Sequence, residues 1–140
     1  METFRSLNET YYRNAHSCLL VYDISKKKSF DDCKGYFYKK LKENCGKDIP
    51  VILLGNKTDL ENERKVPTKY GVEFAKKKNF IFMETSALKN ENVADAFETL
   101  IELTHREIIK KRNELGIKEK KDNNITISIK EHKKTKKIFC

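Results

Sequence analysis

The chain has 140 residues, with 30 Lys and Arg against 21 Asp and Glu, so its formal net charge is +9. This length suits one small domain and excludes two independent ones. Because 36% of the residues are charged and 38% are hydrophobic, we expect a thin core and part of the chain outside it as a tail.

The basic excess does not indicate a nucleic-acid-binding protein. The chain has 25 Lys but only 5 Arg, whereas base recognition favours the planar fork of Arg. An AT-rich coding sequence also yields many Lys and Asn and no Trp, without selection for charge. We therefore expect no nucleic-acid partner.

The four cysteines indicate a reducing compartment. Cys18, Cys33, Cys45 and Cys140 form neither a C-x-x-C pair nor a Cys/His cluster with zinc spacing. The sequence also lacks a run of about 18 apolar residues and a charged-then-apolar amino terminus. We therefore expect a cytoplasmic protein without a signal peptide or a membrane-spanning helix.

Three short apolar runs predict strands, at residues 17–24, 51–54 and 80–83. The first is the longest, and we expect it to be buried on both faces. Runs that are continuous rather than alternating are typical of parallel sheets covered by helices.

Helical patterns follow each of these strands. Ser29 is the expected N-cap of a helix with the apolar stripe Phe30, Cys33, Phe37 and Leu41. A shorter helix is expected from Thr68, and a long one over residues 92–113. The stripe expected on the long helix is Val93, Phe97, Leu100, Ile101, Thr104 and Ile108. The alternation of strands and helices predicts an α/β fold with a doubly wound parallel sheet.

The last fifth of the chain has a different composition. Residues 114–140 contain eight Lys and four acidic residues, and they supply +4 of the net charge. We expect a flexible basic tail, in which the alternating segment 125–129 stays unpaired. The expected organisation is thus a domain over residues 1–113 and a tail over 114–140.

Polar motifs follow the second and third strands, at the edge where parallel sheets bind ligands. The carboxylate of Asp59 suits the ring N–H and amino group on one edge of guanine, a pattern that adenine lacks. Asn56 can join neighbouring loops and reach a ring nitrogen, and the stem of Lys57 can lie on a purine face. The alternative for this motif alone is a polar turn.

The second motif begins 28 residues later, at Glu84. Within it Ser86 precedes Ala87, whose small side chain lets a backbone N–H approach a carbonyl oxygen such as guanine O6. The alternative for this motif alone is a cap and turn leading to a helix. The two motifs together, each after an apolar strand, predict a guanine site.

The chain resembles the Rab family of small GTPases, within the Ras superfamily. The resemblance rests on Asn-Lys-Thr-Asp at 56–59 and Glu-Thr-Ser-Ala at 84–87. It also rests on Glu-Thr-Phe-Arg-Ser-Leu at 2–7, Tyr-Tyr-Arg-Asn-Ala at 11–15 and Leu-Val-Tyr-Asp-Ile-Ser at 20–25. It implies a P-loop NTPase-type sheet, here partial, with three of the family's six strands and its last three helices. Leu88 stands where the family more often has Lys, which removes one contact to the base.

Several family features are missing from these 140 residues. No glycine begins a G-x-x-x-x-G-K-[ST] phosphate loop, and switch I, with its Mg²⁺-binding Thr, is also lacking. The family's Asp-x-x-Gly does not precede Glu2, and Met1 stands where the family has the Gln that orients water. We therefore expect a truncated chain without a Mg²⁺ site that does not hydrolyse GTP alone.

The resemblance implies a GTP- or GDP-binding protein of vesicle trafficking. Its implied partners are effectors, an exchange factor, a GTPase-activating protein and GDI, the family's GDP-dissociation inhibitor. The alternative is a non-catalytic Rab-like interaction protein that binds effectors or membrane without turnover. The residues expected to face or support effectors are Phe4, Arg5, Leu7, Tyr11, Tyr12 and Arg13. For Tyr11 and Tyr12, simple packing onto the sheet stays an equal alternative.

The tail adds a membrane hypothesis. Rabs end in prenylated cysteines, and Cys140 follows a cluster of lysines at residues 133–137. Its ending is neither Cys-Cys, Cys-x-Cys nor C-a-a-X, so an unmodified thiol stays open. The lysines favour an anionic membrane, on the cytosolic face of endomembranes.

Overall fold

The computed structural model describes residues 12–45 and 48–117. Within them three strands form a parallel sheet in the order β1-β2-β3, with β1 at Cys18–Asp23, β2 at Val51–Asn56 and β3 at Ile81–Thr85. The predicted α/β fold with a parallel sheet is therefore confirmed.

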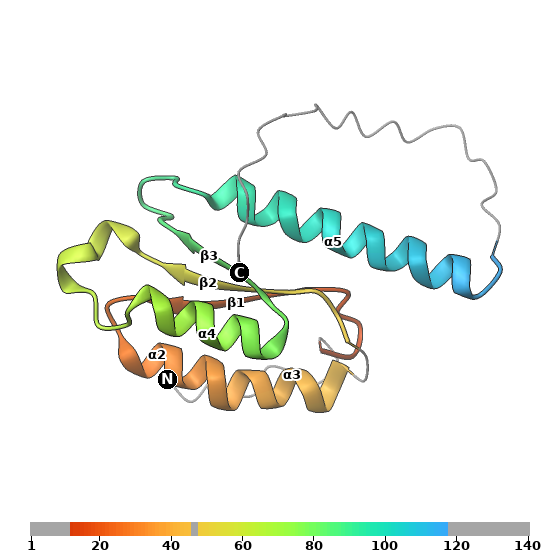
Figure 1. Cartoon of the computed structure of the whole chain (residues 1–140), viewed down its shortest axis with the longest axis horizontal. Coiled ribbons are helices and arrows are strands. Elements are labelled where there is room, and N and C mark those ends of the chain that lie inside the picture. Colours follow the sequence, from red (N-terminus) through yellow and green to blue (C-terminus); the bar gives the residue numbers. More distant parts are fainter. Residues whose placement is uncertain (1–11, 46–47, 118–140) are drawn as a thin grey trace.

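The helices cover both faces of this sheet (Figure 1). One face is covered by a continuous helical stretch, made of α2 (Lys27–Asp32), the π-helical turn η1 (Cys33–Phe37) and α3 (Tyr38–Cys45), together with α4 (Thr68–Lys78). The other face carries α5 (Val93–Glu114). The short 3₁₀ segment η2 (Thr58–Glu63) follows β2. These are the layers of a doubly wound fold.

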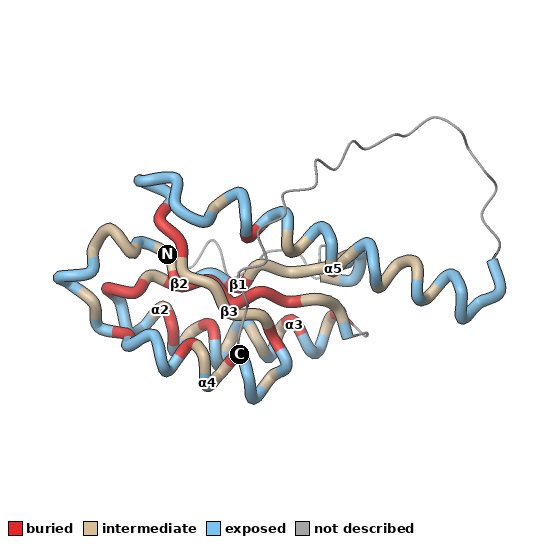
Figure 2. Tube along the Cα trace, turned by 45° about the horizontal axis from the view of Figure 1, so that its top comes forward, coloured by how far each residue is buried: buried red, intermediate tan, exposed pale blue. Residues whose placement is uncertain are grey.

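The core has two parts, one on each face of the sheet. Beneath α2, α3 and α4, Leu20, Tyr22 and Leu53 pack with aromatic rings from the helices. Beneath α5, Ile52 and Leu54 pack against Ala96. Figure 2 shows the buried residues concentrated along the strands and the inner sides of the helices.

β1 is not buried on both faces, contrary to the sequence-based expectation. Leu20 and Tyr22 point into the larger core, but Val21, on the opposite face, is 48% exposed. Among the described residues β1 pairs only with β2. Its outer edge and part of its α5-side face therefore lack cover from the described chain.

Two details of the first helix also differ from expectation. The helix begins at Lys27 with Lys26 as N-cap, so Ser29 lies inside it. The Ser29 hydroxyl donates to Lys26 O at 2.7 Å and accepts the Asp23 N–H at 3.0 Å. The π-helical turn shifts the helix phase, which leaves Phe37 38% exposed while Cys33 and Leu41 stay buried.

The sheet-facing stripe of α5 is also rotated from the expected one. The residues that pack on the sheet are Ala96, Leu100 and Leu103, whereas Phe97 and Ile101 are 54% and 66% exposed. Sequence periodicity finds an apolar face, but α5 has apolar residues on two adjacent faces. Only contact with the strands selects one of them.

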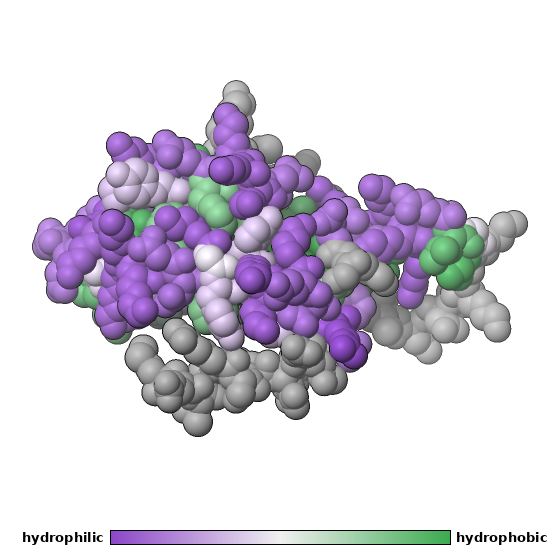
Figure 3. Space-filling model, turned by 90° about the horizontal axis from the view of Figure 1, so that it is seen from below, coloured by the Kyte–Doolittle hydropathy of each residue, from purple (hydrophilic) through white to green (hydrophobic). Residues whose placement is uncertain are grey.

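The outer sides of α2, α3 and α4 are mostly hydrophilic (Figure 3). These outer sides therefore face solvent with polar and charged side chains. Four of the expected effector residues, Phe4, Arg5, Leu7 and Tyr11, lie outside the described residues, as do Cys140 and the tail from residue 118.

Candidate functional site

The ends of the three strands are aligned at the carboxyl edge of the sheet. Asp23 ends β1 and is the register partner of Asn56, which ends β2 and is in turn the partner of Thr85 at the end of β3. Parallel pairing thus brings together the loops that follow β2 and β3. This confirms that the two sequence motifs meet at one edge.

Asn56 ties these loops together. Its side-chain oxygen Oδ1 accepts a hydrogen bond from Thr85 Oγ1 at 3.1 Å and from the Ala87 N–H at 3.2 Å. Its backbone oxygen accepts the Ile24 N–H at 3.1 Å. The Ala87 amide, expected to meet a ligand carbonyl, is therefore bonded to Asn56 in this structure.

Asp59 is oriented by Ser86. The fully buried Ser86 hydroxyl donates to Asp59 Oδ1 at 2.5 Å and accepts the Lys89 N–H at 3.1 Å. Asp59 Oδ2 accepts no hydrogen bond within the described ranges. A half-buried carboxylate is thus fixed through one oxygen, while the other is left for a donor such as a ring N–H.

Lys57 has an uncommon backbone conformation, and its side chain forms an ion pair. Its φ of 71° and ψ of 42° are left-handed, a conformation that costs a non-glycine residue energy. Its ammonium Nζ lies 2.9 Å from Asp23 Oδ2. The hydrogen bond and charge of Asp23 raise the pKa of Lys57, so the lysine is cationic at neutral pH.

Asp23 was not identified from the sequence as a site residue. Its Oδ1 accepts the Ser25 N–H at 2.9 Å and the Ser25 hydroxyl at 2.7 Å. Burial raises the pKa of Asp23, but the bonds from Ser25 and Lys57 outweigh burial and leave it below its ordinary value. The sequence could have indicated Asp23, because it lies at the carboxyl end of a strand, where parallel sheets bind ligands. That rule identified Asn56.

Arg64 was also missed, although it joins the end of η2 to β3. Its guanidinium bonds both oxygens of Glu61, at 2.8 and 2.6 Å, and both oxygens of Glu84, at 2.7 and 3.1 Å. It also donates to Val66 O at 3.1 Å. These bonds raise the pKa of Arg64. No local pattern marks this arginine as a site residue, because Glu84 lies on a separate strand, 20 residues away.

The loop after β3 folds back on itself. Ser86 and Glu91 form an antiparallel bridge, and the Asn92 side chain donates to Glu84 O at 3.0 Å. This loop leaves Leu88, expected beside the base, 82% exposed. Leu88 therefore projects into solvent at the rim of the site.

Tyr12 and Arg13 are the expected effector residues that the structure describes. Tyr12 is half-buried against the larger core, and its backbone oxygen accepts the thiol of Cys45 at 3.2 Å. Arg13 is exposed. Part of the Tyr12 side chain therefore packs against the core. Arg13 is the more solvent-accessible of the two residues.

Residues 12–45 and 48–117 lack two other features. These residues contain no group of three or more His, Cys, Asp or Glu side chains arranged to hold a metal ion. No helix among them combines the length and apolar character needed to cross a membrane.

Much of the chain is similar in sequence to known proteins. The family model described as "Ras family" matches residues 1–110. "Ras-related protein RGP1" of Oryza sativa subsp. japonica and "Ras-related protein RABA4c" of Arabidopsis thaliana are each 43% identical over 112 residues, which is 80% of this chain and 49% of each relative. "Ras-related protein Rab11D" of Nicotiana tabacum is 42% identical over 100 residues, 71% of this chain and 45% of that protein.

The chain thus spans about half the length of the curated relatives it matches. The match includes both motifs at the carboxyl edge of the sheet, since the family model extends from residue 1 to residue 110. By the extent of this match and the names of its relatives, the chain belongs to the Ras superfamily of small GTPases, as a member of the Rab family.

Proposed function

We propose that this chain serves as a Rab-type GTP-binding protein of vesicle trafficking, and that its described residues recognise the guanine base. The observation that carries the proposal is the Asp59 carboxylate, fixed by Ser86 through Oδ1 while Oδ2 is left for a ligand donor. Guanine offers two adjacent donors to such a carboxylate, whereas adenine offers none in that arrangement.

The neighbouring residues support the same ligand. The aliphatic stem of Lys57 can cover one face of a purine while its ammonium stays on Asp23. Asn56 already holds the Thr85–Ala87 backbone beside the second motif. A planar base bound to Asp59 would therefore contact side chains and backbone that are already held in position at the carboxyl edge of the sheet.

Our proposal assigns base recognition, not hydrolysis, to these residues. The 140 residues contain no G-x-x-x-x-G-K-[ST] motif, and phosphoryl transfer depends on such a loop and Mg²⁺ for charge stabilisation. Three or four hydrogen bonds of ~1 kcal/mol each correspond to a dissociation constant of about 1–6 mM. We therefore expect weak binding that distinguishes bases.

The membrane and partner roles are further parts of this proposal. The lysines of residues 118–140 suit an anionic membrane surface, and Cys140 is the candidate for prenylation. Effectors and regulators of the Rab type are the proposed protein partners. The residues of this chain proposed to face or support them are Phe4, Arg5, Leu7, Tyr11, Tyr12 and Arg13.

A second candidate function is a non-catalytic Rab-like protein that binds effectors or membrane without turnover. It is favoured by the same lack of a phosphate-loop motif in these 140 residues. Calorimetric titration of GDP with Mg²⁺ into the purified chain measures nucleotide binding directly. Micromolar or tighter binding supports a complete nucleotide site and contradicts our expectation of a weak one.

The guanine proposal itself is tested by NMR titration with nucleosides. Guanosine is expected to shift the backbone amides of Asn56 and Ala87 saturably, and adenosine is not. Asp59→Asn should abolish the preference, because an amide cannot accept at both positions that guanine requires. The control is Asp95→Asn, at an exposed position in the first turn of α5. Equal shifts with adenosine, or an unchanged preference in Asp59→Asn, would refute guanine recognition here.

A further inference from the structure

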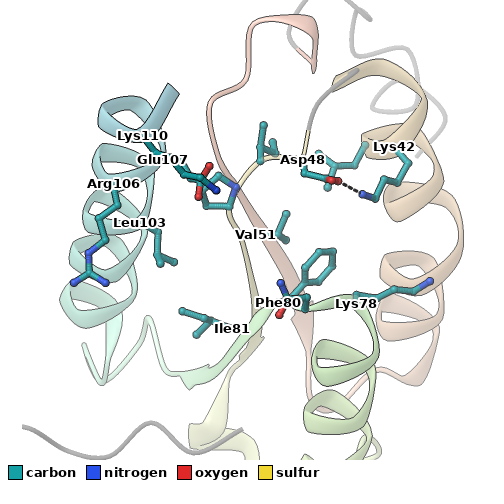
Figure 4. A pocket seen from close by; sticks show the side chains of 14 residues that line it. Lys42, Asp48, Val51, Lys78, Phe80, Ile81, Leu103, Arg106, Glu107 and Lys110 are labelled. Carbon is teal, nitrogen blue, oxygen red and sulfur yellow. Dashed lines mark hydrogen bonds and ion pairs between the residues drawn. The ribbon is translucent and has the colours of Figure 1, made fainter. Parts of the chain in front are cut away.

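A cavity lies at the opposite end of the strands from Asp59. Its volume is about 620 Å³, and its walls come from α3, the segment before β2, the starts of β2 and β3, the end of α4, and α5. Figure 4 shows α3 on one side of the cavity and α5 on the other. We call it the α3–α5 cavity. A volume of this order is typical of small-molecule sites.

Apolar side chains line the inner part of the α3–α5 cavity. Leu41, Val51 and Phe80 are 5%, 5% and 8% exposed. Ile81 and Leu103 are half-buried, and the side chain of Leu103 points from α5 toward the strands (Figure 4). Burying apolar groups of a ligand against this surface is favourable by about 25 cal/mol per Å². The floor therefore suits a hydrocarbon body.

The rim of the cavity is charged, with an excess of cations. Its lining includes four of them, Lys42, Lys78, Arg106 and Lys110, against Asp48 and Glu107. The ammonium of Lys42 is bonded to Asp48 at 2.6 Å, so this acid is already neutralised. The net charge of the lining is therefore positive, as is that of the whole chain.

Three of the four rim cations already have partners. Besides the Lys42 pair, Lys78 lies 4.2 Å from the ring centroid of Tyr38, and Arg106 pairs with Glu102 at 3.7 Å. Lys110 forms no ion pair with any residue of the described chain. It is thus the cation most available to an anionic group on a ligand.

This cavity is independent of the guanine site and of the uncovered edge of the sheet. Its lining includes no residue of β1 and none of the two motifs at the carboxyl edge. The inference does not rest on the proposed function.

We propose that the α3–α5 cavity binds an anionic amphiphile, a carboxylate carried on a flexible hydrocarbon chain. The chain lies on the apolar floor between Leu103 and Val51, and the carboxylate meets Lys110 at the rim. Because the chain carries a net positive charge, its electrostatic field favours entry of an anion over a cation. We therefore propose an anionic ligand that meets Lys110, rather than a cationic ligand that pairs with Glu107.

The test uses the 140-residue chain and decanoate below its micelle concentration. Calorimetry should give saturable binding, and methyl NMR should give intermolecular contacts from decanoate to Leu103 and Ile81. Lys110→Glu should weaken binding by about tenfold or more, through loss of one charge-assisted contact and its replacement by a repelling charge. Leu103→Trp, which fills the cavity, should abolish binding while far-UV circular dichroism stays unchanged.

The matched control is Arg112→Glu on the same helix. It makes the same change of charge at an exposed position outside the lining, roughly 200° around the helix from Lys110. Its effect on affinity should stay below about twofold, since solvent and salt screen it.

Four results would overturn the proposal. The first is the absence of saturable decanoate binding to the folded chain. The second is an equal effect of Lys110→Glu and Arg112→Glu. The third is binding of decyltrimethylammonium as tight as that of decanoate, which would assign the rim to a cation. The fourth is contacts from decanoate to Phe97 and Ile101, which would place it on the exposed face of α5 instead.

Discussion

Lys57 Nζ lies 2.9 Å from Asp23 Oδ2, so an ion pair joins the segment after β2 to the end of β1. Through Oδ1, the same carboxylate accepts hydrogen bonds from the Ser25 backbone N–H and from the Ser25 hydroxyl. Asp23 is only 12% exposed in its side chain. It therefore connects Lys57 to the sheet, although neither sequence motif contains it.

The first prediction concerns acid stability. Because the folded pKa of Asp23 lies below its unfolded value, its contribution is fully present above about pH 4 and is lost as the pH falls through the folded pKa. Asp23→Asn should lower the free energy of unfolding by about 1–2 kcal/mol at pH 7. This difference should shrink toward zero in the most acidic part of the range.

Urea unfolding at a series of pH values measures this difference. The control is Asp31→Asn, whose carboxylate is half-exposed and paired with Lys34 at 3.0 Å. An exposed pair of this kind is worth less than about 1 kcal/mol. A gap between wild type and Asp23→Asn that stays constant down to pH 2 would contradict a depressed pKa.

The second prediction concerns Arg64. Its replacement by Ala removes the bonds to Glu61, Val66 O and Glu84 and leaves the half-buried Glu84 carboxylate with fewer partners. We expect a loss of about 1–3 kcal/mol of unfolding free energy, read from the urea midpoint at constant m.

Two further variants sharpen this experiment. Arg64→Lys should recover only part of the loss, because an ammonium cannot bond two carboxylates in the bidentate manner of the guanidinium. Arg106→Ala, in an exposed pair, should cost less than about 0.5 kcal/mol. Equal losses in Arg64→Ala and Arg106→Ala would show that the Arg64 contacts contribute little.

The third prediction uses two glycines with opposite surroundings. A Cβ on Gly71, in α4, would lie 2.3 Å from Phe82 Cε2 and 2.8 Å from the Tyr22 hydroxyl oxygen. Gly71→Ala should therefore destabilise the chain by about 1–3 kcal/mol through overpacking. The helical Gly35 has no atom within 4 Å of such a Cβ, and Gly35→Ala should stabilise by about 0.5–1 kcal/mol.

Thermal unfolding followed by circular dichroism measures both alanine variants. The expected shifts in the melting temperature have opposite signs, although the two substitutions are chemically identical. A rise in melting temperature for Gly71→Ala would mean that α4 sits farther from β3 than the structure places it.

The fourth prediction concerns association through β1. Its outer edge has no strand partner in the described chain, and Val21 on this strand is 48% exposed. An uncovered apolar edge strand promotes pairing between molecules. We therefore expect the purified chain to self-associate as its concentration rises, and Val21→Lys to reduce this association.

Size-exclusion chromatography with light scattering measures the association. The control is Tyr70→Lys, at a similarly exposed residue on α4, which should leave the association unchanged. A sharp monomer peak for the unmodified chain, together with a cooperative melt, would exclude association through this edge.

The sequence by itself determined the order of strands and helices and the position of the site. Apolar runs such as residues 51–54 form strands because a buried parallel strand needs apolar side chains on both faces. The two motifs follow such runs directly, so parallel pairing alone places Asn56 and Ser86 at one edge. These features depend on short stretches of chain, which local patterns describe well.

Only the tertiary structure decided which faces are buried and which residues join the site. Phe97 and Leu100 fit the same periodicity, but contact with the sheet buries the side of α5 that carries Leu100. Arg64 meets Glu84 across 20 positions, and Asp23 meets Lys57 across two strands. Such pairs form when separate segments pack, because distance in space, rather than spacing along the chain, sets their energy.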